Sequence, residues 1–151
     1  MTAEPKRQDE RRILGRVETE PQYPSPFTVV GRLRSFRHAF AGLLFVLRSQ
    51  HNAWLHGVVT VLALVLGVAV RLSADEWCLL VLAIAVVWVA EAFNTGLEVL
   101  ADTVVPERHP TVKIAKDVAA GAVLLASLGA LVIGCLLFVP RLAAVIARIV
   151  R

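Results

Sequence analysis

The stretch W-C-L-L-V-L-A-I-A-V-V-W-V-A-E-A-F-N-T-G-L-E-V-L-A-D, Trp77 to Asp102, decides the fold of this chain. The part before Glu91 carries no charge, and the part from Glu91 onward carries three acidic residues and an asparagine. A helix needs about 20 mainly apolar residues to cross the hydrocarbon core of a membrane. The stretch therefore predicts a transmembrane helix with a polar end, and that polar end needs an explanation.

The composition places the whole chain in a membrane. Its 151 residues are 57% hydrophobic, with a mean hydropathy of +0.68, whereas soluble domains are about 45–50% apolar. The net charge is +4, but the basic residues lie beside apolar runs, which favours anionic lipid and membrane topology over nucleic acid as their partner. Cys78 and Cys135 fall inside apolar runs and have neither disulfide nor metal-site spacing.

Outside this stretch, the chain predicts an all-α membrane protein with three transmembrane helices preceded by an amphipathic surface helix. Apolar residues recur at helical spacing in the surface helix with arginines between them, which is typical of a helix among lipid headgroups. An integral membrane domain is expected at 27–140. Its segments and flanks are a disordered charged tail at 1–26, the surface helix at 27–48, spans at about 54–72, 77–101 and 111–139, and a short amphipathic tail at 141–151.

The distribution of lysine and arginine predicts the orientation of the spans. Nine of them precede the first span, Arg71 follows it, three lie between the second and third spans, and three follow the third. With the N-terminus in the cytoplasm, twelve of these residues lie inside (9 + 3) and four outside (1 + 3). The loop between spans two and three should then face the cytoplasm, where ATP is found.

The polar residues of the second span fall on one helical face. At about 100° per residue, with Glu91 at zero, Asn94 lies near about −60°, Glu98 near about −20° and Asp102 near about +20°. An acidic side chain at the centre of a membrane helix costs on the order of 2.5–3.5 kcal/mol. Such a stripe calls for positive charge, and the candidates are a divalent metal, Lys116 and the arginines of the surface helix.

The start of the third helix offers complementary groups. The segment H-P-T-V-K-I-A-K-D-V-A-A-G-A-V-L-L begins at His109 and places Lys113, Lys116 and Asp117 on its first turns. Carboxylates with a lysine near a helix N-terminus suit a metal-bound polyphosphate. The alternative is that both lysines extend toward the interface only as anchors of the helix end.

These two segments resemble the prokaryotic diacylglycerol kinase family of small three-span lipid kinases. The resemblance rests on E-A-F-N-T-G-L-E-V-L-A-D (91–102), on the segment from His109 to 125, and on S-F-R-H-A-F-A-G-L (35–43), and it covers roughly 32–140. The sequence that follows His109 is most similar to that of the undecaprenol kinases of Gram-positive bacteria. Whether the acceptor is undecaprenol or diacylglycerol stays open.

The resemblance implies an ATP-dependent lipid kinase of the bacterial cytoplasmic membrane, built as a homotrimer with composite sites between subunits. It implies Glu91 as general base toward the lipid hydroxyl and Glu98 as a ligand of Mg²⁺. Asn94 and Asp102 would support the site by hydrogen bonds. The lipid substrate is expected beside Glu91, Arg37 and Trp54. The residues expected at ATP are Glu98, Asp102, Glu107, Arg108, His109, Lys116 and Asp117.

One segment departs from the family pattern. Before the first span the family has E-x-N-x-R-I-H, and this chain has Q-H-N-A-W-L-H from Gln50 to His56. At the position of the family's metal-binding glutamate this chain has Gln50, and at the position of the family's arginine it has Trp54. An amide oxygen can coordinate Mg²⁺ but supplies no charge. Two other hypotheses therefore stand beside the kinase: a transporter or channel that uses the acidic stripe, and a family member that binds lipid without turnover.

Overall fold

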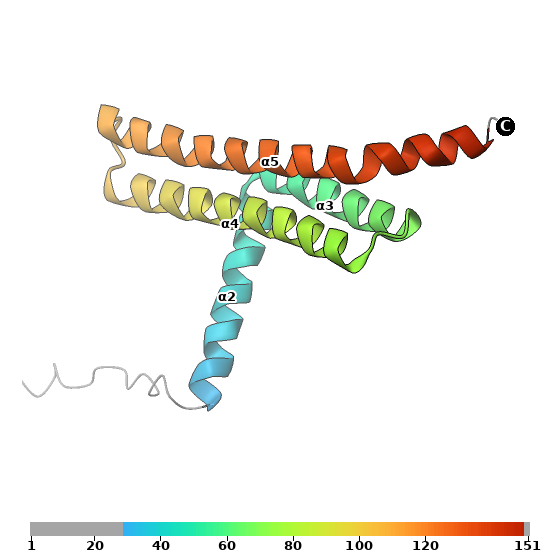
Figure 1. Ribbon diagram of the computed structural model, residues 1–151. Helices are drawn as coiled ribbons and strands as arrows, with labels where there is room; N and C mark the ends of the chain where they lie inside the picture. The colour runs from blue at the N-terminus through green and yellow to red at the C-terminus, as the bar shows by residue number, and fades with distance from the viewer. Residues whose placement is uncertain (1–28, 150–151) are drawn as a thin grey trace, which may run out of the picture. The chain divides into compact units, whose positions relative to one another are not determined.

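The computed structural model describes residues 29–149, which form four helices (Figure 1). They are α2 (Val29–Ser49), α3 (His51–Ala69), α4 (Ala74–Val104) and α5 (Pro110–Ile149). No strand occurs between residues 29 and 149. The expected tail at 1–26 lies outside the described residues. The all-helical fold with three long apolar helices confirms the predicted fold class.

The chain divides into two compact units between Phe40 and Ala41. The described part of the first unit is the N-terminal portion of α2, where the apolar side chains of Leu33 and Phe36 are exposed between arginines. The second unit holds the end of α2 together with α3, α4 and α5. The residues that concern the site, apart from Arg37, belong to the second unit.

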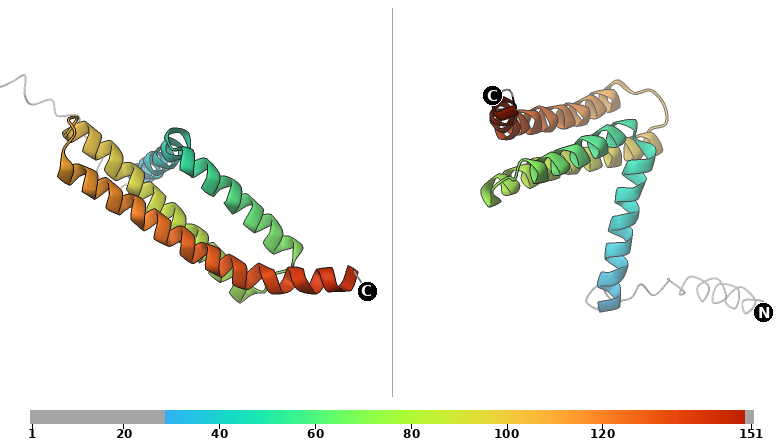
Figure 2. Two further views of the ribbon diagram at one scale, coloured as in Figure 1. Left: turned by 90° about the horizontal axis from the view of Figure 1, so that it is seen from above. Right: turned by 90° about the vertical axis from the view of Figure 1, so that its right-hand side faces the viewer.

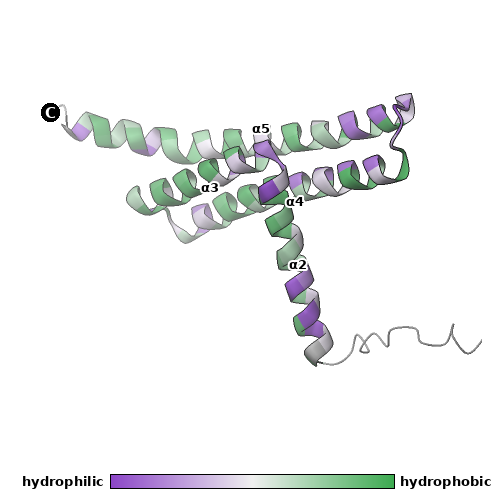
Figure 3. Cartoon of the chain, turned by 180° about the vertical axis from the view of Figure 1, so that it is seen from behind, coloured by the Kyte–Doolittle hydropathy of each residue, from purple (hydrophilic) through white to green (hydrophobic). Residues whose placement is uncertain are grey.

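Helices α3, α4 and α5 are each long and apolar enough to cross a membrane. Large apolar side chains cover their outer faces, as with Phe93, which is 77% exposed, and Leu125, which is 72% exposed. Lipid chains solvate such faces as well as a protein core does. Along α4 and α5, hydrophilic residues gather where the two helices join (Figure 3). The chain is therefore an integral membrane protein whose polar chemistry lies at one end of these helices.

The helix bounds differ from the sequence expectation mainly at the C-terminus. Helix α5 continues through Pro140 to Ile149, so the segment expected as a short separate tail is, as far as Ile149, the last part of α5. An interior proline removes one backbone hydrogen bond, and its ring clashes with the carbonyl four residues earlier, at a cost of about 3 kcal/mol. The residue after it, Arg141, is nevertheless helical and pairs with Glu76 of α4. Helix α3 begins at His51, three residues before the expected span, and α4 extends beyond its expected span at both ends.

A tight turn joins α3 to α4. Arg71 adopts a left-handed conformation with φ of 54°, and Leu72 N donates to Gly67 O at 3.1 Å, which closes the end of α3. Gly67 permits the close approach of α4, because a Cβ there would lie 3.0 Å from Cη2 of Trp77 and 3.1 Å from Cδ1 of Leu72. The turn thus fixes α4 beside α3.

Helices α4 and α5 run side by side in opposite directions along most of the length of α4 (Figure 2). Their buried contact includes Leu80 and Leu137, which form an apolar cluster with Leu72 near the α3–α4 turn. Trp88 of α4 also donates from Nε1 to Oγ1 of Thr60 on α3 at 3.1 Å. The apolar cluster lies at the start of α4, and the loop that leads from α4 into α5 lies at the opposite end of that helix.

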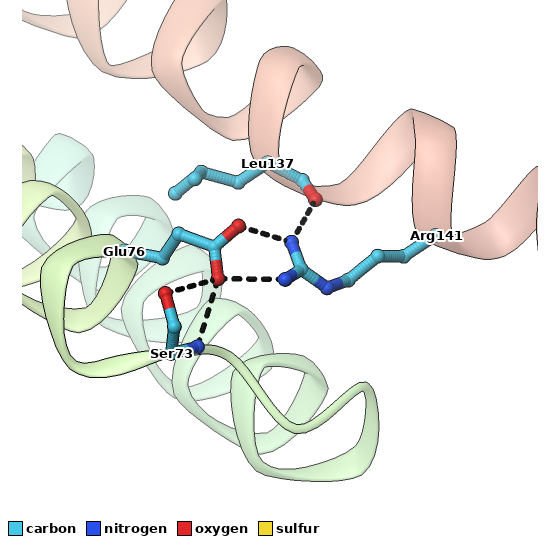
Figure 4. A network of polar contacts seen from close by, with 4 residues as sticks. All are labelled: Ser73, Glu76, Leu137 and Arg141. Atoms are coloured by element: carbon cyan, nitrogen blue, oxygen red, sulfur yellow. Dashed lines mark hydrogen bonds and ion pairs between the residues drawn. The ribbon is translucent and has the colours of Figure 1, made fainter.

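An ion pair between Glu76 and Arg141, called the Glu76–Arg141 clamp below, joins α4 to α5 near the apolar cluster (Figure 4). Arg141 of α5 donates to both carboxylate oxygens of Glu76 on α4, from Nη1 at 2.5 Å and from Nη2 at 2.6 Å. Glu76 also accepts from the backbone N of Ser73 at 2.8 Å, completing a capping box at the start of α4. One carboxylate thus caps α4 and ties it to α5.

Candidate active site

The buried face of α4 changes from apolar to polar at Glu91. Leu80, Ala83 and Val87 are buried, and the same stripe continues with Glu91, Asn94 and Thr95. Glu91 is only 1% exposed, yet within the described part of the chain neither of its carboxylate oxygens has a hydrogen-bond partner. The Oδ1 atom of Asn94 is buried without a partner among the same residues. The site therefore presents three buried acceptor atoms that need a donor or a cation.

The four polar residues expected on one stripe become more exposed toward the end of α4. Glu91 and Asn94 are buried, Glu98 is half-buried and Asp102 is exposed. On the opposite side Phe93 and Leu100 are 77% and 63% exposed, as an apolar face toward lipid requires. The stripe therefore leads from the interior of the second unit to the polar loop after α4.

Gln50 joins this stripe from the break between α2 and α3. Its Nε2 donates to Oε2 of Glu98 at 2.8 Å, and Nδ2 of Asn94 donates to Oε1 of Glu98 at 3.5 Å. The structure thus brings together Gln50, Asn94 and Glu98, which the sequence assigned to the metal and catalytic positions. The amide nitrogen of Gln50, and not its carbonyl oxygen, is the atom that meets Glu98.

A hollow of about 550 Å³ lies where α4 joins α5. Five of the seven residues expected at ATP line it: Asp102, Glu107, Arg108, His109 and Lys116. Glu98 and Asp117 do not line it. The start of α5 also borders the hollow, and a helix N-terminus favours a bound anion. The hollow has both the charge and the backbone environment that phosphate groups need.

Two ion pairs hold the lysines of α5. Lys116 Nζ lies 2.5 Å from Oδ1 of Asp102, joining α5 to the end of the polar stripe. Lys113 Nζ lies 2.6 Å from Oδ2 of Asp117, one turn along the same helix. The Lys113–Asp117 pair is exposed and adds little stability. Of these two lysines, Lys116 is the one that pairs with the acidic stripe.

His109 caps the start of α5. Its Nδ1 accepts from the backbone N of Thr111 at 3.3 Å, and its carbonyl oxygen accepts from Lys113 N at 3.1 Å. The imidazole therefore contacts the backbone at the helix end, and His109 also lines the hollow.

The two other residues expected at the lipid are Trp54 and Arg37. Trp54 is 65% exposed and lines an apolar groove with Leu47, Gly57 and Leu62. Arg37 is exposed and belongs to the first unit. Their assignment to the lipid substrate stays a prediction.

Sequence reasoning missed Thr95 and Arg141. Thr95 is 1% exposed and donates from Oγ1 to the carbonyl oxygen of Glu91 at 2.9 Å, so its side chain packs against the backbone of Glu91. Its position four residues after Glu91 places it on the same helical face, which is a signal that could have identified it. Arg141 was counted only as a charge after the third span. Its pairing with Glu76 connects residues 65 positions apart, which no local pattern reveals.

Among residues 29–149 no cluster of three or more histidine, cysteine or acidic side chains is placed to hold a metal ion. Mg²⁺ is usually bound in proteins through one or two carboxylates, with waters and substrate phosphates completing its shell. The half-buried Glu98 carboxylate, which contacts the side chain of Asn94, fits that mode.

Comparison with known proteins identifies the family of the chain. The model of the family described as prokaryotic diacylglycerol kinase matches residues 37–138. An undecaprenol kinase of Bacillus subtilis is 36% identical over 109 residues, covering 72% of this chain and 89% of that protein. A diacylglycerol kinase of Synechocystis is 40% identical over 112 residues, covering 73% of this chain and 64% of that protein. No solved structure gives a significant match. The chain therefore belongs to the prokaryotic diacylglycerol kinase family and is a membrane-embedded lipid kinase.

Proposed function

We propose that this chain transfers the γ-phosphoryl group of ATP to the hydroxyl group of a membrane lipid alcohol, undecaprenol or diacylglycerol, at the cytoplasmic boundary of the bilayer. The observation that carries the proposal is the carboxylate of Glu91, which is buried and has no partner among the described residues. Relatives named as undecaprenol kinase and diacylglycerol kinase support both acceptors.

Glu91 acts as the general base. A lipid hydroxyl that reaches Glu91 donates its hydrogen bond to a carboxylate that lacks any other donor in the described chain. As the hydroxyl oxygen forms its bond to the γ-phosphorus, its proton passes to Glu91 and the bond from phosphorus to the bridging oxygen of ADP breaks. Asn94 supports the site through its own unpartnered oxygen. This arrangement places the proton acceptor on the membrane side of the reaction.

Glu98 is the carboxylate that binds Mg²⁺ together with the phosphates of ATP. It is half-buried and lies between Glu91 and Asp102 along the stripe. When bound, the ion neutralises phosphate charge and aligns the γ-phosphoryl group. The role of the protein is to hold the carboxylate of Glu98 between Glu91 and the nucleotide hollow.

The hollow at the α4–α5 loop receives the nucleotide. Lys116 leaves Asp102 to neutralise phosphate charge, and the first turn of α5 adds its positive end. Glu107, Arg108 and His109 border the same space, where they contact the remainder of ATP. Asp117 lies one turn along α5, paired with Lys113, and joins the site when ATP draws that lysine away.

The family resemblance further supports a homotrimer with composite sites. Glu91 needs a partner that the described residues of one chain do not supply, and the outer faces of α4 and α5 are apolar. Positive charge counted along the sequence supports a cytoplasmic N-terminus and a cytoplasmic α4–α5 loop in a bacterial inner membrane.

A phosphorylation assay tests the proposal. The full chain in lipid nanodiscs is supplied with Mg²⁺ and γ-labelled ATP, and with undecaprenol or diacylglycerol in separate samples. We expect labelled lipid with at least one acceptor, and its loss in Glu91→Gln. Asp75→Asn is the matched control, since Asp75 is an exposed carboxylate in the first turn of the same helix. Absence of labelled lipid with both acceptors, in protein that binds ATP, would overturn the proposal.

A further inference from the structure

Gln50 is the one residue between α2 and α3, and its side chain is not used to cap a helix. Its backbone is extended, with φ of −110° and ψ of 122°, at the position that precedes the first residue of α3. A side chain at this position commonly accepts from the backbone of its own helix, but Gln50 makes no such bond. The carboxamide is therefore free to contact another element.

The backbone at Gln50 is held in place by its neighbours. Gln50 N donates to the carbonyl oxygen of Val46 at 3.1 Å. Val46, one turn before it, is 6% exposed, and Ala53, one turn after it, is 0% exposed. With one buried residue on each side of the break, the backbone at Gln50 is anchored, and its carboxamide reaches α4 from there.

The contact with Glu98 has a defined chemical sense. A carboxylate only accepts hydrogen bonds, so the nitrogen of a carboxamide must face it. Nε2 of Gln50 lies 2.8 Å from Oε2, while Asn94 donates to Oε1 from 3.5 Å. Each oxygen of Glu98 thus meets one neutral donor and keeps a second lone pair for a cation.

We propose that Gln50 is a positioning residue for the kinase reaction. Its amide nitrogen orients the carboxylate of Glu98 before a cation arrives, and its carbonyl oxygen does not bind the metal. This reverses the expectation that position 50 contributes a metal ligand. The importance of Glu98 in the reaction rests on the proposed function, whereas its contact with Gln50 does not.

The charge of the side chain at position 50 follows from this role. Without a bound cation, a second carboxylate there would face Oε2 of Glu98 across hydrogen-bond distance with no proton donor between them, and two such groups repel each other. A neutral donor avoids this repulsion and prepares Glu98 without a resident ion. A glutamine at this position is then a functional residue and not a defective glutamate.

Amide resonances test the contact without ATP or lipid. The chain has three glutamines, Gln8, Gln22 and Gln50, so carboxamide ¹⁵N labelling gives few signals and Gln50→Ala assigns one of them. We expect an Nε2 proton of Gln50 to resonate downfield, to shift upfield in Glu98→Ala, and to stay downfield when Mg²⁺ and a non-hydrolysable ATP analogue are added. A resonance that is insensitive to Glu98→Ala, or a carbonyl ¹³C shift on metal addition as expected of a ligand, would overturn the proposal.

A double-mutant cycle on Mn²⁺ affinity separates positioning from ligation. Affinity is measured by electron paramagnetic resonance with the same nucleotide analogue. We expect Gln50→Ala to weaken Mn²⁺ binding about tenfold, as loss of a hydrogen bond to a charged group does, and to have less than about a twofold effect in a Glu98→Ala background. Equal losses in both backgrounds would mean that Gln50 binds the ion itself.

Two controls complete the design. Ser49→Ala removes a hydroxyl that bonds only within its own helix, to the carbonyl oxygen of Phe45, and should leave Mn²⁺ affinity unchanged. Where Glu98→Ala binds too little Mn²⁺ for the cycle, the amide resonances decide. Because they are recorded first in the ligand-free protein, the proposal for Gln50 can fail while lipid phosphorylation is observed, and the reverse can also occur.

Discussion

Arg141 of α5 holds the carboxylate of Glu76 on α4 through both guanidinium nitrogens, at 2.5 and 2.6 Å. A second inter-helix ion pair, between Lys116 and Asp102, lies at the other end of α4. The two acidic partners are separated by about 39 Å along α4 at about 1.5 Å per residue. This matches a bilayer whose apolar core is about 30 Å thick, with its interfacial layers on both sides. We therefore expect the two pairs to lie near the two membrane surfaces.

This spacing also sets the position of Glu91 along α4. Fifteen residues separate Glu91 from Glu76, and eleven separate it from Asp102, which corresponds to about 22 Å and about 16 Å along the helix. Along α4, Glu91 is thus nearer to the nucleotide hollow than to the Glu76–Arg141 pair.

Breaking the Glu76–Arg141 clamp should destabilise the helix pair. Glu76→Gln leaves Arg141 half-buried without its counter-ion and also weakens the cap of α4. We expect a lower midpoint of thermal unfolding in detergent micelles, with kcat per folded molecule unchanged because the clamp lies at the other end of α4 from the hollow. The double variant Glu76→Gln/Arg141→Met should recover part of the loss, since no unpaired charge is left. A double variant less stable than either single variant would contradict this account.

Replacing Glu91 with glutamine should lower the kinase activity and raise the thermal stability. In Glu91→Gln the buried group becomes neutral, and a neutral amide costs less to bury than a carboxylate without a partner. We expect kcat to fall by roughly 10²–10⁴-fold, the usual contribution of a general base, while the thermal midpoint rises. Glu91→Asp keeps the charge and should recover neither property fully. A fall in both activity and thermal midpoint for Glu91→Gln would argue for a structural carboxylate.

Lys116 should control the affinity for ATP. In Lys116→Ala the hollow loses a positive charge, and Asp102 keeps an unopposed charge beside the phosphates. We expect KM for ATP to rise about tenfold, equivalent to about 1.4 kcal/mol, with KM for the lipid alcohol changed much less. Lys113→Ala is the comparison, because Lys113 also lines the hollow but pairs with Asp117 of its own helix and not with the acidic stripe. Equal effects of the two substitutions would show that only the total positive charge matters.

Gly67 should be intolerant of a side chain. A Cβ at this position comes within 3.0 Å of Trp77 and 3.1 Å of Leu72, so Gly67→Ala must displace α4 or the turn. We expect a loss of about 1–3 kcal/mol, as for other overpacked sites, measured by denaturation in mixed micelles. Gly57→Ala in the same helix meets nothing within 4 Å and should be neutral or slightly stabilising. Similar losses at both positions would point to helix–helix contacts between subunits.

Local pattern accounts for much of the molecule. The apolar runs predicted three membrane helices because each must satisfy its own backbone hydrogen bonds in lipid. Helical periodicity predicted that the four polar residues of the second span share one face, and the capping box at Ser73 was readable from the spacing to Glu76. The extra length of α5 was not readable, because Pro140 usually signals a helix end and only Arg141 on its far side shows why the helix continues.

The sequence by itself determined which residues are polar within apolar spans, and therefore where the chemistry of this kinase must lie. Only the tertiary structure decided how those residues are paired: Gln50 with Glu98, Lys116 with Asp102, Arg141 with Glu76, and Glu91 with no described partner. The physical reason is that periodicity reports the direction of a side chain about its own helix axis. The identity of the atom that it meets depends on how a second helix, distant in sequence, packs against the first.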